Sequence, residues 1–174
     1  MEIRKVGAMI INKVKEILIA KFGDEVIIAE ELNQKQPALI INPELIDEVC
    51  LILRDHPETW FDFLSCLTGV DYGVEQKKFG VIYHLSSIIK KHQIVLKTFK
   101  ENDRDLNQLP VFKSISAVYK AAEWHEREAF DLFGIYFENH PDLRRILLPD
   151  DWEGYPLRKD YQTAENYHNI KIDF

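Results

Sequence analysis

The sequence predicts a single α+β domain with an extended C-terminal segment. Two stretches, residues 9–22 and 117–133, repeat their apolar side chains with the period of an amphipathic helix. Between them lie short runs rich in β-branched residues, which are typical of strands. After residue 148, two prolines and a glycine exclude a long helix. We therefore expect an α+β core domain over residues 1–148 and an extended, partner-binding segment over residues 149–174.

The first half of the chain is expected to fold as helix, strand, strand and helix. Residues 9–22 carry one apolar face, and Gly23 ends that helix. Residues 26–29 and 38–42 are two short β-branched runs, which we predict to be strands. A proline then opens a second helical pattern over residues 43–53.

The middle of the chain predicts an antiparallel pair of strands. Residues 79–85 are apolar enough for a strand that is buried on both faces, and residues 92–100 alternate in character. The short Lys90-Lys91 link favours an antiparallel connection. Residues 63–72 begin with helical spacing and pass into a glycine-containing turn or strand, so their type stays open.

Composition excludes several classes of function. The chain has 174 residues and a net charge of −7, the wrong sign for collecting nucleic-acid phosphates or lying on an anionic membrane. Its longest uncharged run, residues 79–89, is too short to span a bilayer. Cys50 and Cys66 lie in apolar stretches without a CxxC motif, so we expect them to be reduced and buried. The first ten residues lack a secretory or transit pattern, which predicts a cytoplasmic protein.

Residues 117–133 carry the most informative helical pattern. On a helical wheel, Glu123, Arg127 and Asp131 form one charged stripe, which we expect to be a solvated or interfacial edge. Glu126 and Glu128 instead fall among apolar neighbours. A carboxylate in such surroundings needs a partner, because taking its charge out of water is costly.

Arginines that follow the helix are the predicted partners of these glutamates. Gly134 ends the helix, residues 135–138 predict a short strand, and Asn139, His140 and Pro141 form a turn. Arg144 and Arg145 come next, and their guanidinium groups can fold back as bidentate donors. We therefore expect a buried glutamate–arginine clasp, with either Arg144 or Arg145 as the donor.

A catalytic or metal-binding role is the alternative for this helix. His125, Glu126 and Glu128 have the right chemistry for acid–base work, but side chains two apart on a helix diverge by about 200°. Glu126 and Glu128 therefore do not reach the same ion or substrate. The sequence also lacks a Glu-x-x-His pair and a glycine-rich phosphate loop. We expect no catalytic, cofactor-binding or metal-binding residue in this chain.

The C-terminal segment has two possible arrangements. Its aromatic side chains beside arginine are the types that dominate binding hot spots. The segment either packs back on its own domain or lies across a partner protein, where Ile170, Ile172 and Phe174 alternate as in an added strand. We favour the second arrangement. The predicted partner contacts are Arg144, Trp152, Tyr155, Leu157, Arg158 and Tyr161.

The same part of the chain resembles a known family. The motif comprises Glu126-Arg127-Glu128, then Asp131-Leu132-Phe133-Gly134, then His140-Pro141-Asp142-Leu143-Arg144-Arg145-Ile146-Leu147. It closely resembles the 30 kDa subunit family of respiratory complex I, the proton-pumping NADH:quinone oxidoreductase. Residues 63–72, 79–88 and 151–161 also resemble the family, so the likeness covers about residues 60–161.

The resemblance implies a non-catalytic structural subunit of the hydrophilic arm. Such a subunit binds no flavin or cluster itself, while the whole complex uses FMN, iron–sulfur clusters, NADH and quinone. It docks on the quinone-site subunit, which is similar to hydrogenase large subunits, and its C-terminal segment reaches across neighbouring subunits. The implied location is the cytoplasmic side of the bacterial inner membrane, where partners hold the chain as a peripheral protein.

Two other functions stay open. Related membrane-bound hydrogenases or ferredoxin:quinone reductases use a similar subunit, and nothing in the sequence names the electron donor. A free-standing acid–base enzyme using His125, Glu126 or Glu128 is the least favoured, because these side chains diverge on the helix.

Overall fold

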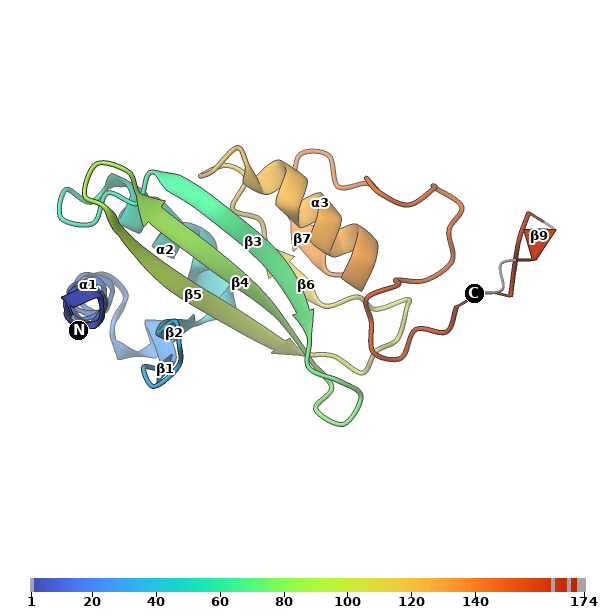
Figure 1. The fold of residues 1–174 in the computed structure, drawn as a ribbon, viewed down its shortest axis with the longest axis horizontal. Coiled ribbons are helices and arrows are strands. Elements are labelled where there is room, and N and C mark those ends of the chain that lie inside the picture. Colours follow the sequence, from blue (N-terminus) through green and yellow to red (C-terminus); the bar gives the residue numbers. More distant parts are fainter. Residues whose placement is uncertain (1, 164, 169, 172–174) are drawn as a thin grey trace.

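A five-stranded sheet forms the centre of the computed structural model, which describes residues 2–163, 165–168 and 170–171 (Figure 1). Its strands are β1 (Ile27–Glu31), β2 (Ala38–Ile41), β3 (Phe63–Asp71), β4 (Lys78–Ser87) and β5 (His92–Glu101), in the spatial order β1-β2-β5-β4-β3. The helices are α1 (Glu2–Phe22), α2 (Ile46–Asp55) and α3 (Ala122–Phe133). Two small pairs complete the described elements: β6 (Val111–Lys113) with β7 (Tyr136–Glu138), and β8 (Asn166–Tyr167) with β9 (Ile170–Lys171). This is the α+β arrangement that the sequence predicts.

The predicted order of helix, strand, strand and helix in the first half is confirmed. The first helix begins earlier than the apolar pattern indicates, at Glu2. A 3-10 turn, Asp24–Val26, delays the first strand by one residue. A second such turn precedes α2, where the Asn42 side chain accepts a hydrogen bond from the Glu44 N–H at 3.0 Å.

The sheet is mixed, because it contains both antiparallel and parallel pairs of strands. β4 and β5 pair antiparallel through the Lys90-Lys91 turn, as predicted. β2 runs parallel to β5, and β3 pairs antiparallel with β4 at the edge of the sheet. Residues 63–72, whose type the sequence left open, therefore form mostly strand, since one face of β3 joins the core.

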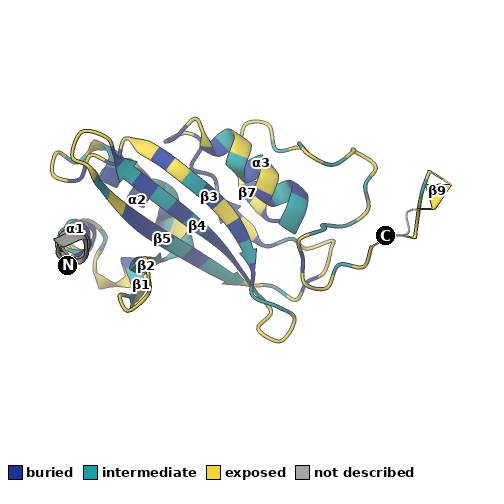
Figure 2. Cartoon of the chain, viewed as in Figure 1, coloured by how far each residue is buried: buried dark blue, intermediate teal, exposed yellow. Residues whose placement is uncertain are grey.

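The core lies between the sheet and the helices. α2 buries Ile46, Val49, Cys50 and Leu53, one apolar face of the helix, and lies behind the sheet (Figure 1). α1 packs beside β5 and β1, and α3 packs along β3. Figure 2 shows the resulting band of buried residues along the central strands. Gly69 permits the close approach of α3, since a Cβ there would lie 3.0 Å from the Phe133 side chain and 3.4 Å from that of Ala129.

Two local predictions need correction. The helix expected over residues 117–133 begins only at Ala122, because the Val118 and Tyr119 N–H groups both donate to the Ile115 carbonyl in a turn. Of the two cysteines expected to be buried, Cys50 is buried and Cys66 is only half-buried; both are free thiols. The difference arises because Cys66 lies on the outer face of the edge strand, away from the core.

The described part of the C-terminal segment contains no helix, and β9 lies apart from the sheet (Figure 1). Ile170 is exposed in the small β8–β9 hairpin. Ile172 and Phe174, the other members of the predicted alternation, lie outside the described residues.

Candidate functional site

A buried carboxylate on α3 organises the motif that the sequence singled out. Asp131 is fully buried, and its Oδ1 accepts a hydrogen bond from Arg145 Nη1 at 2.7 Å. Its Oδ2 accepts from the N–H groups of Ile146, Leu147 and Leu148 at 3.0, 2.7 and 2.9 Å. We call this arrangement the Asp131–Arg145 clasp.

Hydrogen bonds keep Asp131 ionised despite its burial. Burial by itself would raise the pKa of this carboxyl. The donors from Leu148, Arg145, Leu147 and Ile146 outweigh burial and leave the pKa below its usual value. The clasp is therefore an ion pair supported by three main-chain donors, which fix residues 145–148 against the helix.

Arg127 and Arg145 also bind the main chain on either side of residues 146–148. Arg145 Nη2 donates to the carbonyls of Trp152 and Gly154 at 2.8 and 3.1 Å. Arg127 donates to the carbonyls of Arg144 and Arg145 at 3.2 and 3.0 Å. The segment that follows the His140 turn is consequently bound to α3 through its backbone.

The partner predicted for Glu126 is wrong. Glu126 is buried, as expected, but its Oε2 accepts from Ser114 Oγ at 2.6 Å and its Oε1 from the Ile115 N–H at 2.8 Å. Among the described residues, no arginine or lysine lies within ion-pairing distance of it. The arginine of the clasp is Arg145, and its acid is Asp131.

Two side-chain environments assigned on the helical wheel also need correction. Asp131 was expected on a solvated edge, yet residues 145–148 fold back and cover it. Glu128 was expected among apolar neighbours, yet it is exposed, as is Trp124 on the same face. A wheel gives the direction of each side chain, but the covering segment is a tertiary feature.

His140 completes the surroundings of Glu126. Its side chain is buried, and its Nε2 lies 4.0 Å from Glu126 Oε2. His140 Nδ1 accepts from the Asp142 N–H at 3.0 Å, so Nε2 carries the proton that it donates to the Glu123 carbonyl at 3.1 Å. Burial, only partly offset by the Ser114 and Ile115 donors, raises the pKa of Glu126 to about 7.

A second charged network escaped the sequence analysis. Arg104, in a loop, donates two hydrogen bonds to the Asp71 carboxylate at the end of β3 and two to Asp160 at 2.8 and 2.7 Å. The Lys159 N–H also donates to Asp71, at 2.7 Å. Asp71 and Asp160 both lie in segments that carry the family resemblance, and this resemblance could have identified them as site residues. The loop around Arg104 contains no such signal.

The first part of the C-terminal segment packs on its own domain. Arg158 is buried, its Nε donates to the Phe133 carbonyl at 2.7 Å, and its guanidinium lies over the rings of Phe79 and Tyr155. The chain's own carbonyls already occupy the donors of Arg158, and its predicted contact with a partner stays a prediction. Gly134, in the left-handed conformation that ends α3, lies directly against Tyr155 and Arg158.

The other predicted contacts differ in their access to solvent. Arg144, whose side chain is 69% exposed, pairs with Asp142 at the surface. Leu157 is also exposed. Trp152, Tyr155 and Tyr161 are half-buried. Leu147 was not among the predicted contacts and is 62% exposed.

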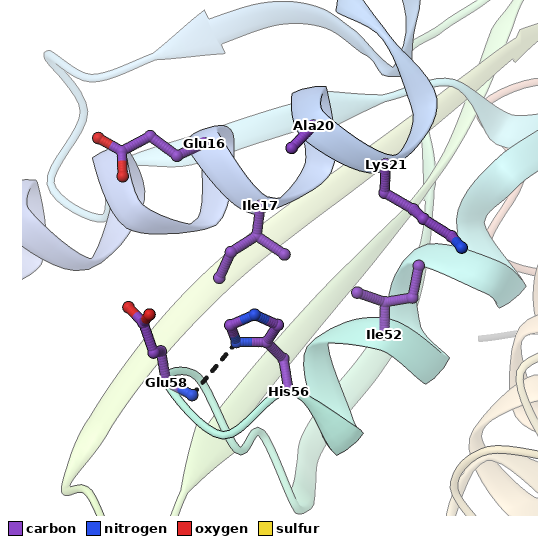
Figure 3. Close-up of a pocket in the computed structure, with 7 residues that line it drawn as sticks. All are labelled: Glu16, Ile17, Ala20, Lys21, Ile52, His56 and Glu58. Carbon is purple, nitrogen blue, oxygen red and sulfur yellow. Dashed lines mark hydrogen bonds between the residues drawn. The ribbon is translucent and has the colours of Figure 1, made fainter.

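Two cavities lie beside α1, at the other end of the molecule. One of about 510 Å³ lies between α1 and the end of α2, where Ile17, Ile52 and His56 face it (Figure 3). His56 Nδ1 there accepts a hydrogen bond from the Glu58 N–H at 3.2 Å. Across the part of the chain that the structure describes, no group of three or more His, Cys, Asp or Glu is placed to hold a metal ion. None of the described helices is both long and apolar enough to cross a membrane.

Solved structures show the same fold. A chain of the membrane-bound sulfane sulfur reductase, an archaeal respiratory membrane complex, superposes with a TM-score of 0.70. The superposition covers 90% of this chain and 85% of the other, at 23% sequence identity.

Sequence comparison finds closer relatives. An NADH-quinone oxidoreductase subunit from Chlorobium phaeobacteroides is 42% identical over 91% of this chain and 93% of the relative. The proteins of the same name from Chloroherpeton thalassium and a Caulobacter species are 39% and 44% identical. Those matches cover 91% and 82% of this chain, but only 63% and 61% of the longer relatives.

A family match covers both charged networks. Residues 39–167 match the family described as "Respiratory-chain NADH dehydrogenase, 30 Kd subunit". This range includes Asp71, Arg104, the Asp131–Arg145 clasp and Asp160. The chain belongs to the 30 kDa subunit family of respiratory-chain NADH dehydrogenase.

Proposed function

We propose that this chain is a non-catalytic, structural subunit in the hydrophilic arm of a proton-translocating NADH:quinone oxidoreductase. In that complex, electrons pass from NADH through FMN and iron–sulfur clusters to quinone. Other subunits hold these cofactors. This chain docks on the quinone-site subunit and is held by its partners at the cytoplasmic side of the bacterial inner membrane. The C-terminal segment, residues 149–174, continues that docking surface.

The observation that carries the proposal is the exposed edge of the Asp131–Arg145 clasp. The clasp binds the main chain of residues 146–148, so this backbone is ordered before any partner arrives. Arg144 and Leu147 nevertheless direct their side chains to solvent. A charged and an apolar side chain on a fixed backbone lose little conformational entropy on binding, which favours tight association.

The chemistry of the buried groups supports a structural role. Glu126, an acid–base candidate from the sequence, and its neighbour His140 are both enclosed and bonded to protein groups. Asp131 is saturated by four donors. These groups stabilise the docking element, and electron transfer belongs to the partner subunits.

Purification of the tagged chain from its own membranes in mild detergent tests the proposal. We expect flavin, iron–sulfur and quinone-site subunits to co-purify. The double variant Arg144→Glu with Leu147→Asp should lower their yield about tenfold, since it changes the charge of one anchor and the polarity of the other. Ile28→Asp is the matched control, because Ile28 is also exposed, at 60%, in β1 at the opposite edge of the sheet from β3 and α3.

Three results would decide against the proposal. Turnover by the isolated chain would make it an enzyme. Co-purification with hydrogenase or ferredoxin-dependent subunits, without an NADH-oxidising flavoprotein, would assign it to a related complex. An unchanged yield from the double variant would mean that docking uses another surface.

A further inference from the structure

A second exposed apolar surface lies at the far end of the sheet. It consists of Trp60, Phe63, Ile88 and Ile89, which are 43%, 48%, 65% and 70% exposed, and we call it the apolar tip. Asp62 Oδ1 accepts a hydrogen bond from the Ile88 N–H at 3.1 Å, which joins the loop before β3 to the β4–β5 turn. Figure 1 shows these two loops together at the end of the sheet opposite the C-terminal segment, and Figure 2 shows that they are exposed.

The fold presents Trp60 rigidly. Its neighbours Thr59 and Phe61 are both fully buried. Thr59 Oγ1 and the Phe61 N–H both donate to the Leu53 carbonyl, at 2.8 and 3.0 Å. Trp60 itself has φ 47°, a left-handed conformation that is unfavourable for a bulky side chain. A large aromatic ring is thus held towards solvent at a cost in backbone strain, as is common at binding sites.

Unpaired positive charge borders the apolar tip. Lys90 and Lys91 follow Ile89 directly and are exposed. Within the described ranges, neither lysine has a carboxylate within ion-pairing distance. A cavity of about 490 Å³ adjoins Lys90, and its lining also includes Lys13, Glu16 and Glu58. These two lysines therefore place positive charge directly beside the apolar tip of a protein whose net charge is −7.

These features identify the chemistry of an occupant. Exposed aromatic and isoleucine side chains suit an apolar partner surface, and two free lysines suit carboxylates beside it. An anionic membrane fits less well, because an extended anionic surface would also face the rest of a chain whose net charge is −7.

We propose that the apolar tip docks a segment of another protein subunit in which apolar side chains are flanked by Asp or Glu. This inference rests on the proposed function, since the segment belongs to the same respiratory complex. The tip and the edge of the Asp131–Arg145 clasp lie on opposite ends of the molecule. The chain therefore links two partner surfaces.

Photo-crosslinking in the intact complex tests the proposal. Ile89 is replaced by p-benzoylphenylalanine, the complex is purified from membranes in mild detergent, and the crosslinked peptides are sequenced. We expect a peptide from another subunit that combines apolar residues with Asp or Glu. A product with lipid only, with a second copy of this chain, or no product at all would overturn the proposal. The same photo-reactive group at Val74 is the control, and equal capture of that peptide there would also overturn it.

Substitutions provide an independent measurement. Ile88→Ser with Ile89→Ser should lower co-purification of the crosslinked protein about tenfold. Lys90→Glu with Lys91→Glu should lower it as well, and most at low salt. Each variant should keep the urea midpoint of the wild type, because all four side chains are exposed. The yield of proteins that co-purify with the wild-type chain distinguishes failure of this inference from failure of the proposed function. If no other protein of the complex co-purifies with the wild-type chain, the proposed function fails. If such proteins co-purify and the tip variants have no effect, only this inference fails.

Discussion

Replacing Asp131 with alanine should destabilise the isolated chain strongly. The carboxylate accepts four hydrogen bonds, three from main-chain N–H groups and one from Arg145. Charge-assisted bonds contribute about 1.5–3 kcal/mol each. The sum over the four bonds is an upper bound, because groups that lose their partner can bind water instead. The freed N–H groups of residues 146–148 lie near the surface and regain water. We therefore expect the loss typical of a broken buried ion pair, about 3–5 kcal/mol in the free energy of unfolding.

Urea unfolding followed by tryptophan fluorescence measures this loss. Asp142→Ala is the matched control, because it removes an acid that pairs with an arginine only at the surface, and we expect no measurable change. Arg145→Ala should have a smaller effect than Asp131→Ala, since Asp131 keeps its three main-chain donors. If Asp131→Ala is as stable as the Asp142→Ala control, the clasp does not stabilise the fold and the reasoning is refuted.

Three further predictions follow from the buried groups. Burial raises the pKa of Glu126 to about 7 from 4.5, so its contribution to stability is fully present below the lower value and is lost as pH rises through the higher one. Glu126→Gln should remove this pH dependence, which is measured as the difference between the urea midpoints at about pH 5 and about pH 8. An equal fall of the midpoint between these pH values in the wild type and the variant would contradict the prediction. Gly134→Ala should cost about 2–4 kcal/mol, because a Cβ would lie 2.5 Å from the Tyr155 ring at positive φ. Gly73→Ala, also at positive φ but with open space, should cost only the backbone part in the same unfolding assay, and equal losses would show that the contact with Tyr155 is unimportant. Arg104→Ala should release the Asp160 segment and speed amide exchange there, whereas unchanged exchange would mean that other contacts hold the segment.

The order of elements was predictable because each depends on nearby residues. The apolar period over residues 9–22 and the alternation over residues 92–100 are local signals; the strand forms where it was predicted, and the helix ends where it was predicted but begins at Glu2. The helix start at Ala122 was not predictable from the period, since the preceding turn has a similar apolar pattern. The family motif also identified the correct segment for the buried charges.

The pairing of the buried charges was not predictable from the sequence. The chain carries Asp131, Glu126 and two candidate arginines within one motif, and the helical wheel assigned the arginine to the wrong acid. Three of the four donors to Asp131 are main-chain N–H groups, which every residue type offers and which therefore leave no trace in a sequence.

Contacts between segments far apart in the sequence were the hardest to predict. Arg104 lies 33 residues from Asp71 and 56 from Asp160, and no local pattern relates them. The exposure of Trp60 follows from the fixed positions of Thr59 and Phe61, which no local pattern displays. Secondary structure arises from short-range preferences that the amino-acid order displays directly. Which charge is buried, and which aromatic side chain remains free for a partner, depends on the segment that folds over it, and packing alone determines that segment.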